Sequence, residues 1–201
     1  MASEIKANKL SPATGTDVVL GDSSDTFTAP SGVTIAIASG ATITNSGTAT
    51  GFGGDNTPAF MAYQGSDASG LTDATTYKVP IDTEVFDTDS AFDHVTNYRF
   101  TVPAGEGGKY SIFASSYMGV SSRVWNYGNV KIYVNGVELI GPNNNWDGYA
   151  EAFTAWITTI LDLSAADYVE VYSRVDTTDG STWGQFAGTR ASVFGGYKLI
   201  I

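Results

Sequence analysis

The sequence predicts an all-β fold, and three observations lead to that prediction. Residues 92–115, FDHVTNYRFTVPAGEGGKYSIFAS, have the pattern of a strand, a Pro/Gly corner and a second strand. Asn135-Gly136 joins two alternating segments and is the strongest hairpin signal in the chain. No segment keeps the apolar spacing of a helix, and the best candidate, 147–163, is rich in β-branched and aromatic residues.

Strand candidates follow one another closely along the C-terminal three quarters of the chain. They cover residues 58–64, 76–86 (interrupted by Pro80), 98–102, 109–118, 130–134, 137–140, 153–163, 168–175, 187–194 and 196–201. About eight to ten strands with frequent turn signals favour a two-sheet sandwich, and the corner at 92–115 is typical of an antiparallel jelly roll. The terminal Leu199-Ile200-Ile201 is expected to be a strand held in the core, because free chain ends seldom carry three aliphatic residues.

The composition excludes several classes of function. The 201 residues include 10 Lys and Arg against 21 Asp and Glu, a net charge of −11, which argues against nucleic acid and anionic membranes as partners. There is no cysteine, so disulfides, thiol catalysis and Cys-ligated zinc are absent. The start, MASEIKANKL, lacks the apolar region of a signal peptide, and no window approaches the ~18 apolar residues of a membrane span. We therefore expect a soluble protein made in the cytoplasm, without membrane insertion.

The N-terminal quarter differs from the rest of the chain in its amino-acid composition. No charged residue occurs between Thr26 and Gly54, and Val33, Ile35 and Ile37 alternate with smaller residues as in a strand. This segment is too thin to build a core alone, so several copies wrapped round a common axis would protect its strand edges. An ordered oligomeric stalk is one interpretation, and a flexible Gly/Ser/Thr linker is the other.

The C-terminal part resembles the trimeric jelly-roll superfamily of complement globular heads and tumour-necrosis-factor cytokines. Pro58-Ala59-Phe60, VKIYVNGVEL, LSAADYVEV and SVFGGYKLII are similar to segments of that family, although Ala166 stands where glycine is usual and one extra residue precedes Leu199. The resemblance covers residues 58–201 and implies a homotrimer with a stalk at its base. The family's signature is matched at Phe92, Asp93, Asn97, Phe100, Pro103, Gly108 and Tyr110.

A second resemblance concerns the N-terminal part. TGTDVVLGDSSDTFTAPSG and ITNSGTATGF resemble stalk sequences in tail fibres and other appendages of marine bacteriophages. This resemblance implies a bacteriophage virion protein, made in the host cytoplasm and exposed on the particle. It divides the chain into a virion-attachment segment (1–25) that binds phage tail or capsid proteins, a β-rich trimeric stalk (26–56) and a jelly-roll head (57–201).

The residue pattern does not indicate an enzyme. His94 is the single histidine, and no Gly-x-Ser-x-Gly elbow, phosphate loop or dinucleotide fingerprint accompanies it. We expect no cofactor and no metal site. Calcium bound by clustered acids is the alternative, because carboxylate oxygens suit that ion, whereas solvated loop acids are the simpler interpretation. These acids are Asp82, Glu84, Asp87, Asp89, Asp93, Asp176 and Asp179.

Aromatic residues in polar, turn-rich loops are the better functional candidates. Rigid aromatic faces beside Asn and Asp could hold a sugar ring of a host receptor, or the same rings could pack at subunit contacts. The candidate receptor or glycan site consists of Trp125, Tyr127, Trp146, Tyr149 and Trp183.

Three functional hypotheses follow from the sequence. The first is a homotrimeric phage tail fibre or spike whose head attaches to a host surface glycan or protein, where three weak sites gain by avidity. The second is a capsid decoration fibre without an obligatory receptor. The third is a depolymerase that cleaves surface glycan.

Overall fold

A computed structural model gives the structure of this protein. It describes residues 26, 28–29, 31–42, 44, 56–122, 124–141, 144–145 and 150–200. The chain divides into two units, Met1–Thr50 and Gly51–Ile201.

The N-terminal unit has turns but no strand among its described residues. Turns at Ser31-Gly32 and Ser39-Gly40 use the left-handed backbone of the two glycines, and Val33, Ile35 and Ile37 between them are exposed. The predicted strand at these residues is not formed in the single chain, because an isolated strand has neither hydrogen-bonding neighbours nor a core. The trimeric stalk over 26–56 and the attachment segment over 1–25 stay predictions, and residues 1–25 lie outside the described part.

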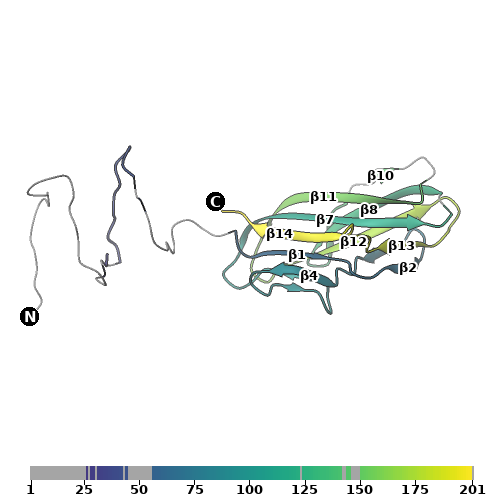
Figure 1. Ribbon diagram of the computed structural model, residues 1–201, viewed down its shortest axis with the longest axis horizontal. Coiled ribbons are helices and arrows are strands. Elements are labelled where there is room, and N and C mark those ends of the chain that lie inside the picture. The colour runs from purple at the N-terminus through teal and green to yellow at the C-terminus, as the bar shows by residue number, and fades with distance from the viewer. Residues whose placement is uncertain are drawn as a thin grey trace, which may run out of the picture. The chain divides into compact units, whose positions relative to one another are not determined.

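The C-terminal unit is a sandwich of two antiparallel sheets (Figure 1). Its described residues contain no helix, so none is long and apolar enough to cross a membrane. Sheet A contains β1 (Ala59–Tyr63), β2 (Ala68–Leu71), β4 (Thr83–Asp87), β7 (Gly108–Val120), β11 (Ala152–Leu163), β13 (Trp183–Phe186) and β14 (Val193–Lys198). Sheet B contains β3 (Thr76–Lys78), β5 (Phe92–Asp93), β6 (Arg99–Thr101), β8 (Trp125–Val134), β9 (Val137–Ile140), β10 (Asn144–Asn145) and β12 (Tyr168–Thr177). The predicted all-β jelly-roll head is confirmed.

Strand β7 organises sheet A. One of its edges pairs with β11 from Gly108↔Leu163 to Gly119↔Ala152. Its other edge pairs first with β14 and then with β13, which lie end to end along it. β14 and the start of β1 lie toward one end of the sandwich, whereas β13 and β2 lie toward the other (Figure 1). We call these the β14 end and the β13 end.

The connection between β13 and β14 corrects the predicted strand at 187–194. Residues 187–192 form no strand, and serine hydroxyls occupy the gap that they leave beside β7. The Ser115 hydroxyl donates to Ala191 O (2.8 Å) and accepts from Val193 N–H (3.1 Å). The Ser192 hydroxyl accepts from Tyr117 N–H (2.9 Å) and donates to Phe186 O (2.8 Å). Side-chain hydrogen bonds therefore replace the ladder here, between the end of β13 at Phe186 and the start of β14 at Val193.

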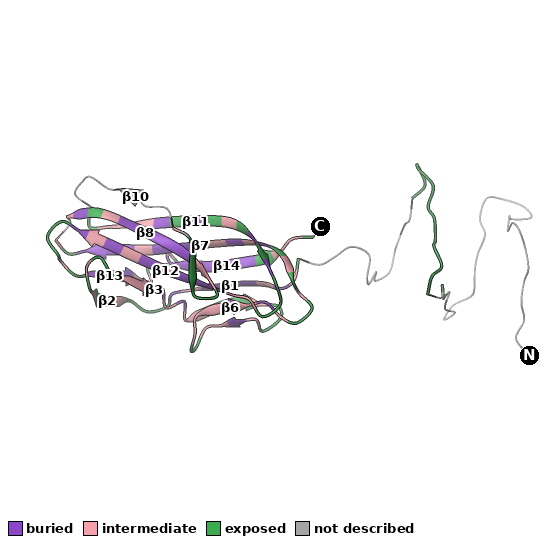
Figure 2. Ribbon diagram, turned by 180° about the vertical axis from the view of Figure 1, so that it is seen from behind, coloured by how far each residue is buried: buried purple, intermediate pink, exposed green. Residues whose placement is uncertain are grey.

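The core between the sheets centres on Phe60 of β1. Its ring stacks on Phe92 (centroids 5.1 Å apart) and on Phe100 (4.6 Å), and meets Phe194 edge-on (4.9 Å). Figure 2 shows that buried residues run along strands of both sheets. The inward positions around these rings are filled by Ala62, Ile112, Ala114, Met118, Val130, Ile132, Val169, Val171 and Val175.

One carboxylate holds the first turn of the predicted corner at 92–115. Asp93 accepts hydrogen bonds from Thr96 N–H (2.8 Å), Val95 N–H (3.0 Å) and both the backbone and the side-chain amide of Asn97 (3.2 and 2.6 Å). The Thr96 hydrogen bond is the largest of the influences that lower the pKa of Asp93 from 3.8 to about 2. Asp93 and Asn97 thus act as a pair that holds the turn between β5 and β6.

The end of the corner places a tyrosine in the core. Pro103 and the positive φ of Gly105 turn the chain, and β7 starts at Gly108. The Tyr110 ring is buried against Phe100, and its hydroxyl donates to Glu106 O (2.5 Å). Burial raises the pKa of Tyr110 to about 12.

The predicted burial of the C-terminal aliphatic residues is wrong. β14 ends at Lys198, whose ammonium group pairs with Glu106 (2.8 Å). Leu199 is half-buried and Ile200 is exposed, because the sandwich ends with β14. Ile201 lies outside the described residues.

We expect Phe60→Ala to lower the free energy of unfolding by about 3–5 kcal/mol, because it opens a cavity among three aromatic rings. Urea unfolding at fixed protein concentration measures this loss. Leu139→Ala, on the exposed part of β9, is the control and should change stability by less than about 0.5 kcal/mol. Equal effects of the two substitutions would contradict the placement of the core.

The low pKa of Asp93 predicts that acid destabilises the corner. Its pKa is lower in the folded state than its ordinary value, so it contributes stability that is complete above pH 4 and is lost as the pH falls from about 4 to about 2. Asp93→Asn should be less stable than the unmodified protein at neutral pH, and the difference should shrink over that window. Urea midpoints measured from pH 6 to pH 2 test this, and a difference that does not vary with pH would refute it.

Candidate functional site

Large apolar side chains, which proteins usually bury, are exposed on the outward face of sheet A. On β11, alternate residues face away from the core, and among them Trp156 is 61% exposed and Ile160 is 63% exposed. We call these two residues the apolar ridge. Both lie on the strand that forms an edge of sheet A, where an exposed apolar surface favours association with another chain.

A groove lies on the same face, on the other side of β7. Its volume is about 270 Å³, and it runs over β4, β1, β14 and β7. Met61 of β1 lies opposite Phe86 of β4, and Phe86 and Tyr197 remain substantially exposed. We call this feature the apolar groove; it is lined by Asn56, Ala59, Phe60, Met61, Phe86, Phe113, Gly196 and Tyr197.

A glycine allows an aromatic ring to form the floor of the groove. A Cβ atom at Gly195 would collide with the ring of Phe113, so the absent side chain lets that ring lie against the backbone of β14. Apart from Asn56, the groove is therefore lined by aromatic and aliphatic surface and by backbone. Such a surface suits an apolar side chain of similar size, not a charged ligand.

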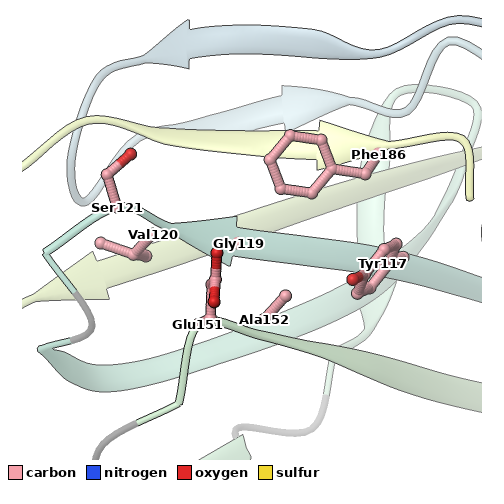
Figure 3. A pocket seen from close by; sticks show the side chains of 7 residues that line it. All are labelled: Tyr117, Gly119, Val120, Ser121, Glu151, Ala152 and Phe186. Atoms are coloured by element: carbon pink, nitrogen blue, oxygen red, sulfur yellow. The ribbon is translucent and has the colours of Figure 1, made fainter.

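A second pocket lies at the β13 end of the same face (Figure 3). Its volume is about 360 Å³. Phe186 of β13 and Tyr117 of β7 form one part of its wall, and Ser121 and Glu151 from the adjoining loops form another. We call it the distal pocket.

The outward face of sheet B has a different character. Lys78 pairs with Glu170 (2.5 Å), Lys131 pairs with Glu138 (2.8 Å), and the Tyr133 and Tyr172 rings lie 4.3 Å apart. The hydrogen bond from Lys131 is the largest of the effects that lower the pKa of Glu138. Charged groups on this face are thus largely engaged with one another.

Two of the predicted binding aromatics are buried, so the expectation that they are exposed is wrong. Trp125 is 4% exposed; its Nε1 donates to Ala150 O (2.6 Å) and its ring packs edge-on against Phe153. Trp183 is 2% exposed; its Nε1 donates to Thr72 O (3.0 Å) and its ring contacts Tyr77. Polar neighbours in the sequence suggested loops, but both residues begin strands and occupy inward positions.

The predicted aromatics do not form one site in the described structure. Tyr127 is half-buried on sheet B, beneath the guanidinium group of Arg174 (5.4 Å from the ring centroid), whereas Trp183 belongs to sheet A. Trp146 and Tyr149 lie outside the described residues, so their predicted role in receptor binding stays a prediction. The exposed Trp156 was not among the candidates, although its i, i+4 spacing with Ile160 places both on one face of a strand.

The predicted acidic residues are engaged in local hydrogen bonds. Asp82 accepts from Gly65 N–H (2.6 Å), Asp87 from Phe92 N–H (2.7 Å), and Asp179 from Ser181 N–H (3.0 Å). His94 lies beside Glu84, with Nδ1 3.4 Å from Oε2. Within the described ranges, no three His, Cys, Asp or Glu side chains gather as a metal site would require. The alternative of bound calcium stays untested.

Comparison with known proteins supports the fold. No protein-family model matches the sequence, and no curated protein matches it. Among solved structures, murine APRIL has a TM-score of 0.52 at 11% identity, over 70% of this chain and 98% of that one. The globular domain of zebrafish complement 1qA has a TM-score of 0.48 at 15% identity, over 71% of this chain and 97% of that one. The likeness to murine APRIL concerns the fold alone and agrees with the two-sheet jelly roll of the head.

Proposed function

We propose that this chain is a structural virion protein: a homotrimeric bacteriophage tail fibre or spike whose jelly-roll head binds a receptor on the host surface without catalysis. The observation that carries the proposal is the pairing of an apolar ridge and an apolar groove on one face of the same head. The phage context rests on the resemblance of the N-terminal segment to fibre stalks.

The positions of ridge and groove favour a closed ring. The ridge lies on the β11 edge of sheet A, whereas the groove lies across β7 on the β14, β1 and β4 side. The ridge of one chain can therefore enter the groove of the next, which is a contact between unlike surfaces. Such contacts close into a ring when a whole number of the rotations that relate neighbouring chains adds up to 360°. The resemblance of residues 58–201 to a trimeric jelly-roll superfamily supports three chains.

The energetics favour association. Burying a Trp or Ile side chain that is otherwise exposed stabilises a contact by roughly 1.5–3 kcal/mol, and each ring contact would bury both ridge residues. A trimer has three such contacts, so the gain can exceed the entropic cost of association. In the N-terminal unit, Val33, Ile35 and Ile37 are also exposed, and three copies of this segment could cover them.

A trimeric head presents each surface feature three times. Three weak receptor contacts on one rigid assembly give a much stronger combined attachment, which suits a fibre that must hold a particle on a cell. The same assembly could instead decorate a capsid, and the place of the protein on the particle decides between the two roles. Immunogold electron microscopy of particles gives that place. Label at the tail supports a tail fibre or spike, whereas label over the capsid would show that the protein is a capsid decoration fibre.

Light scattering of the full chain should give the mass of three chains. Trp156→Lys in the ridge and Phe86→Lys in the groove should each break the head contacts, because either places an ammonium group in an apolar contact. The mass should fall toward that of one chain; if the stalk still holds the chains together, the radius of gyration from small-angle X-ray scattering should rise instead. Val137→Lys, at an equally exposed apolar position on sheet B, is the matched control and should leave both values unchanged. A monomeric unmodified protein would refute the assembly.

Receptor binding predicts competition for host cells. The purified trimer should reduce adsorption of the parent phage to its host, whereas Trp156→Lys should compete much less because it loses avidity. Adsorption is measured as the fraction of unbound particles over time. A trimer that does not compete at any concentration would exclude host attachment by this head. Release of reducing ends from host polysaccharide would instead indicate a depolymerase.

A further inference from the structure

The turn between β8 and β9 contains Asn135-Gly136, a pair of residues that can react without an enzyme. We propose that Asn135 is a site of spontaneous deamidation, and that its hydrogen bonds to Asp167 and Tyr168 control the rate. The inference does not depend on the proposed function, because this hairpin belongs to sheet B, whereas the ridge and the groove lie on sheet A. Of the ten asparagines in the sequence, Asn135 is the one that glycine follows.

The reaction needs only these two residues and water. The Gly136 backbone nitrogen attacks Asn135 Cγ, and the N–Cγ bond forms. The Cγ–Nδ2 bond breaks, and Nδ2 leaves as ammonia with the proton that the Gly136 nitrogen loses. Water then opens the five-membered imide at either carbonyl, which gives aspartate or isoaspartate at position 135. Glycine favours the first step, because it has no Cβ to hinder the approach of its own nitrogen.

The folded hairpin directs the amide group of Asn135 away from Gly136. Both residues have a left-handed backbone, with φ of 52° and 78°, as a type I′ turn requires. Asn135 Nδ2 donates to Asp167 Oδ1 (2.8 Å), and Asn135 Oδ1 accepts from Tyr168 N–H (3.0 Å). Both polar atoms of the amide are therefore engaged at the start of β12. Attack by Gly136 requires the amide to leave these partners and to turn back toward its own backbone.

The partners of Asn135 are themselves held in place. Asp167 Oδ2 accepts from Ser164 N–H (2.8 Å), and Asp167 N–H donates to Ser164 O (3.1 Å). The Asn135 N–H also donates to Tyr168 O (3.0 Å). The hydrogen bond from Asn135 is the largest of the effects that lower the pKa of Asp167, so this carboxylate is charged at neutral pH. A charged acceptor forms a stronger hydrogen bond than a neutral one, which makes Asp167 the main restraint on the amide.

Local opening is enough for the reaction. Asn135 and Gly136 are exposed, so water reaches the turn without unfolding of the head. The end of a hairpin opens at a lower cost in free energy than the whole domain unfolds. We therefore expect slow deamidation in the folded protein, at a rate set by release of the amide from Asp167 and Tyr168.

The product weakens the contact between the hairpin and β12. Aspartate at position 135 cannot donate a hydrogen bond to Asp167, and it places a second negative charge beside that carboxylate. Isoaspartate adds a methylene group to the backbone, which disturbs the pairing of Val134 with Val137. Asn135→Asp reproduces the first product and should lower the melting temperature by about 2–4 °C. An unchanged melting temperature would refute this consequence.

The test is incubation of the full-length protein in warm, mildly alkaline buffer, followed by digestion and mass spectrometry. Deamidation raises the mass of the peptide that contains Asn135, because a hydroxyl group replaces an amino group. Asn126 is the internal control: it is exposed and donates to Asp176 (2.8 Å), but tyrosine follows it. In urea, where these hydrogen bonds are absent, Asn135 should react at least about tenfold faster than in the folded protein. If Asn135 reacts no faster than Asn126 in the unfolded chain, the site is wrong.

Variants at Asp167 test the control of the rate. Asp167→Ala removes the charged acceptor and should speed deamidation of the folded protein about tenfold. Asp167→Asn keeps an acceptor oxygen without the charge and should give an intermediate rate. Asp162→Ala removes the same charge from β11, in the other sheet, and should leave the rate unchanged.

Thermal unfolding shows whether each variant is folded, and Asp167→Asn decides the result if Asp167→Ala is not. Equal rates in the unmodified protein and in the folded Asp167 variants would overturn the control by Asp167. Equal rates in the folded and the urea-unfolded protein would overturn the protection by the fold. Asp162→Ala that speeds the reaction as much as Asp167→Ala would show that net charge, and not the hydrogen bond, sets the rate.

Discussion

The pairing of β7 with its neighbours is the constraint on which the structure depends. This strand is hydrogen-bonded along nearly its whole length to β11 on one edge, and to β14 and then β13 on the other. One register thereby fixes the ridge, the groove and the distal pocket on a single face. The Ser115 and Ser192 hydroxyls complete the arrangement, because they bridge the gap where β14 gives way to β13. Without that change of partner, Phe186 would not lie beside Tyr117.

The two outward faces of the sandwich are suited to different tasks. Sheet A presents apolar side chains whose exposure costs free energy in a monomer and which favour contact between chains. Sheet B presents ion pairs and tyrosine rings, such as Lys78 with Glu170 and Lys131 with Glu138, and its exposed aliphatic residues Val137 and Leu139 lie on β9. This division is what a head needs if one sheet meets neighbouring copies and the other faces outward from the assembly.

Aromatic rings lie on glycine backbone at both ends of sheet A. Phe113 covers Gly195 in the groove, and Phe186 covers Gly119 and Gly184 in the distal pocket. In each case a larger residue would displace the ring, so the glycines determine where apolar surface can lie flat against the sheet. The two places differ in what surrounds the ring. Apolar neighbours complete the groove, whereas Ser121 and Glu151 give the pocket a polar edge.

The sequence by itself determined the all-β class, the Asn135-Gly136 hairpin and the strand–corner–strand pattern at 92–115 that contains the signature residues Phe92, Asn97, Phe100 and Tyr110. These features depend on local alternation, turn chemistry and a signature within a short stretch of chain. Only the tertiary structure decided which aromatic rings are exposed. Alternation puts Trp156 and Ile160 on one face of a strand, but which face meets the other sheet depends on pairing with distant segments. Trp125 and Trp183 are buried for the same reason, since their polar neighbours in sequence say nothing about the residues packed against them. The groove and the distal pocket combine strands more than 60 residues apart in the chain, and only long-range register brings those strands together.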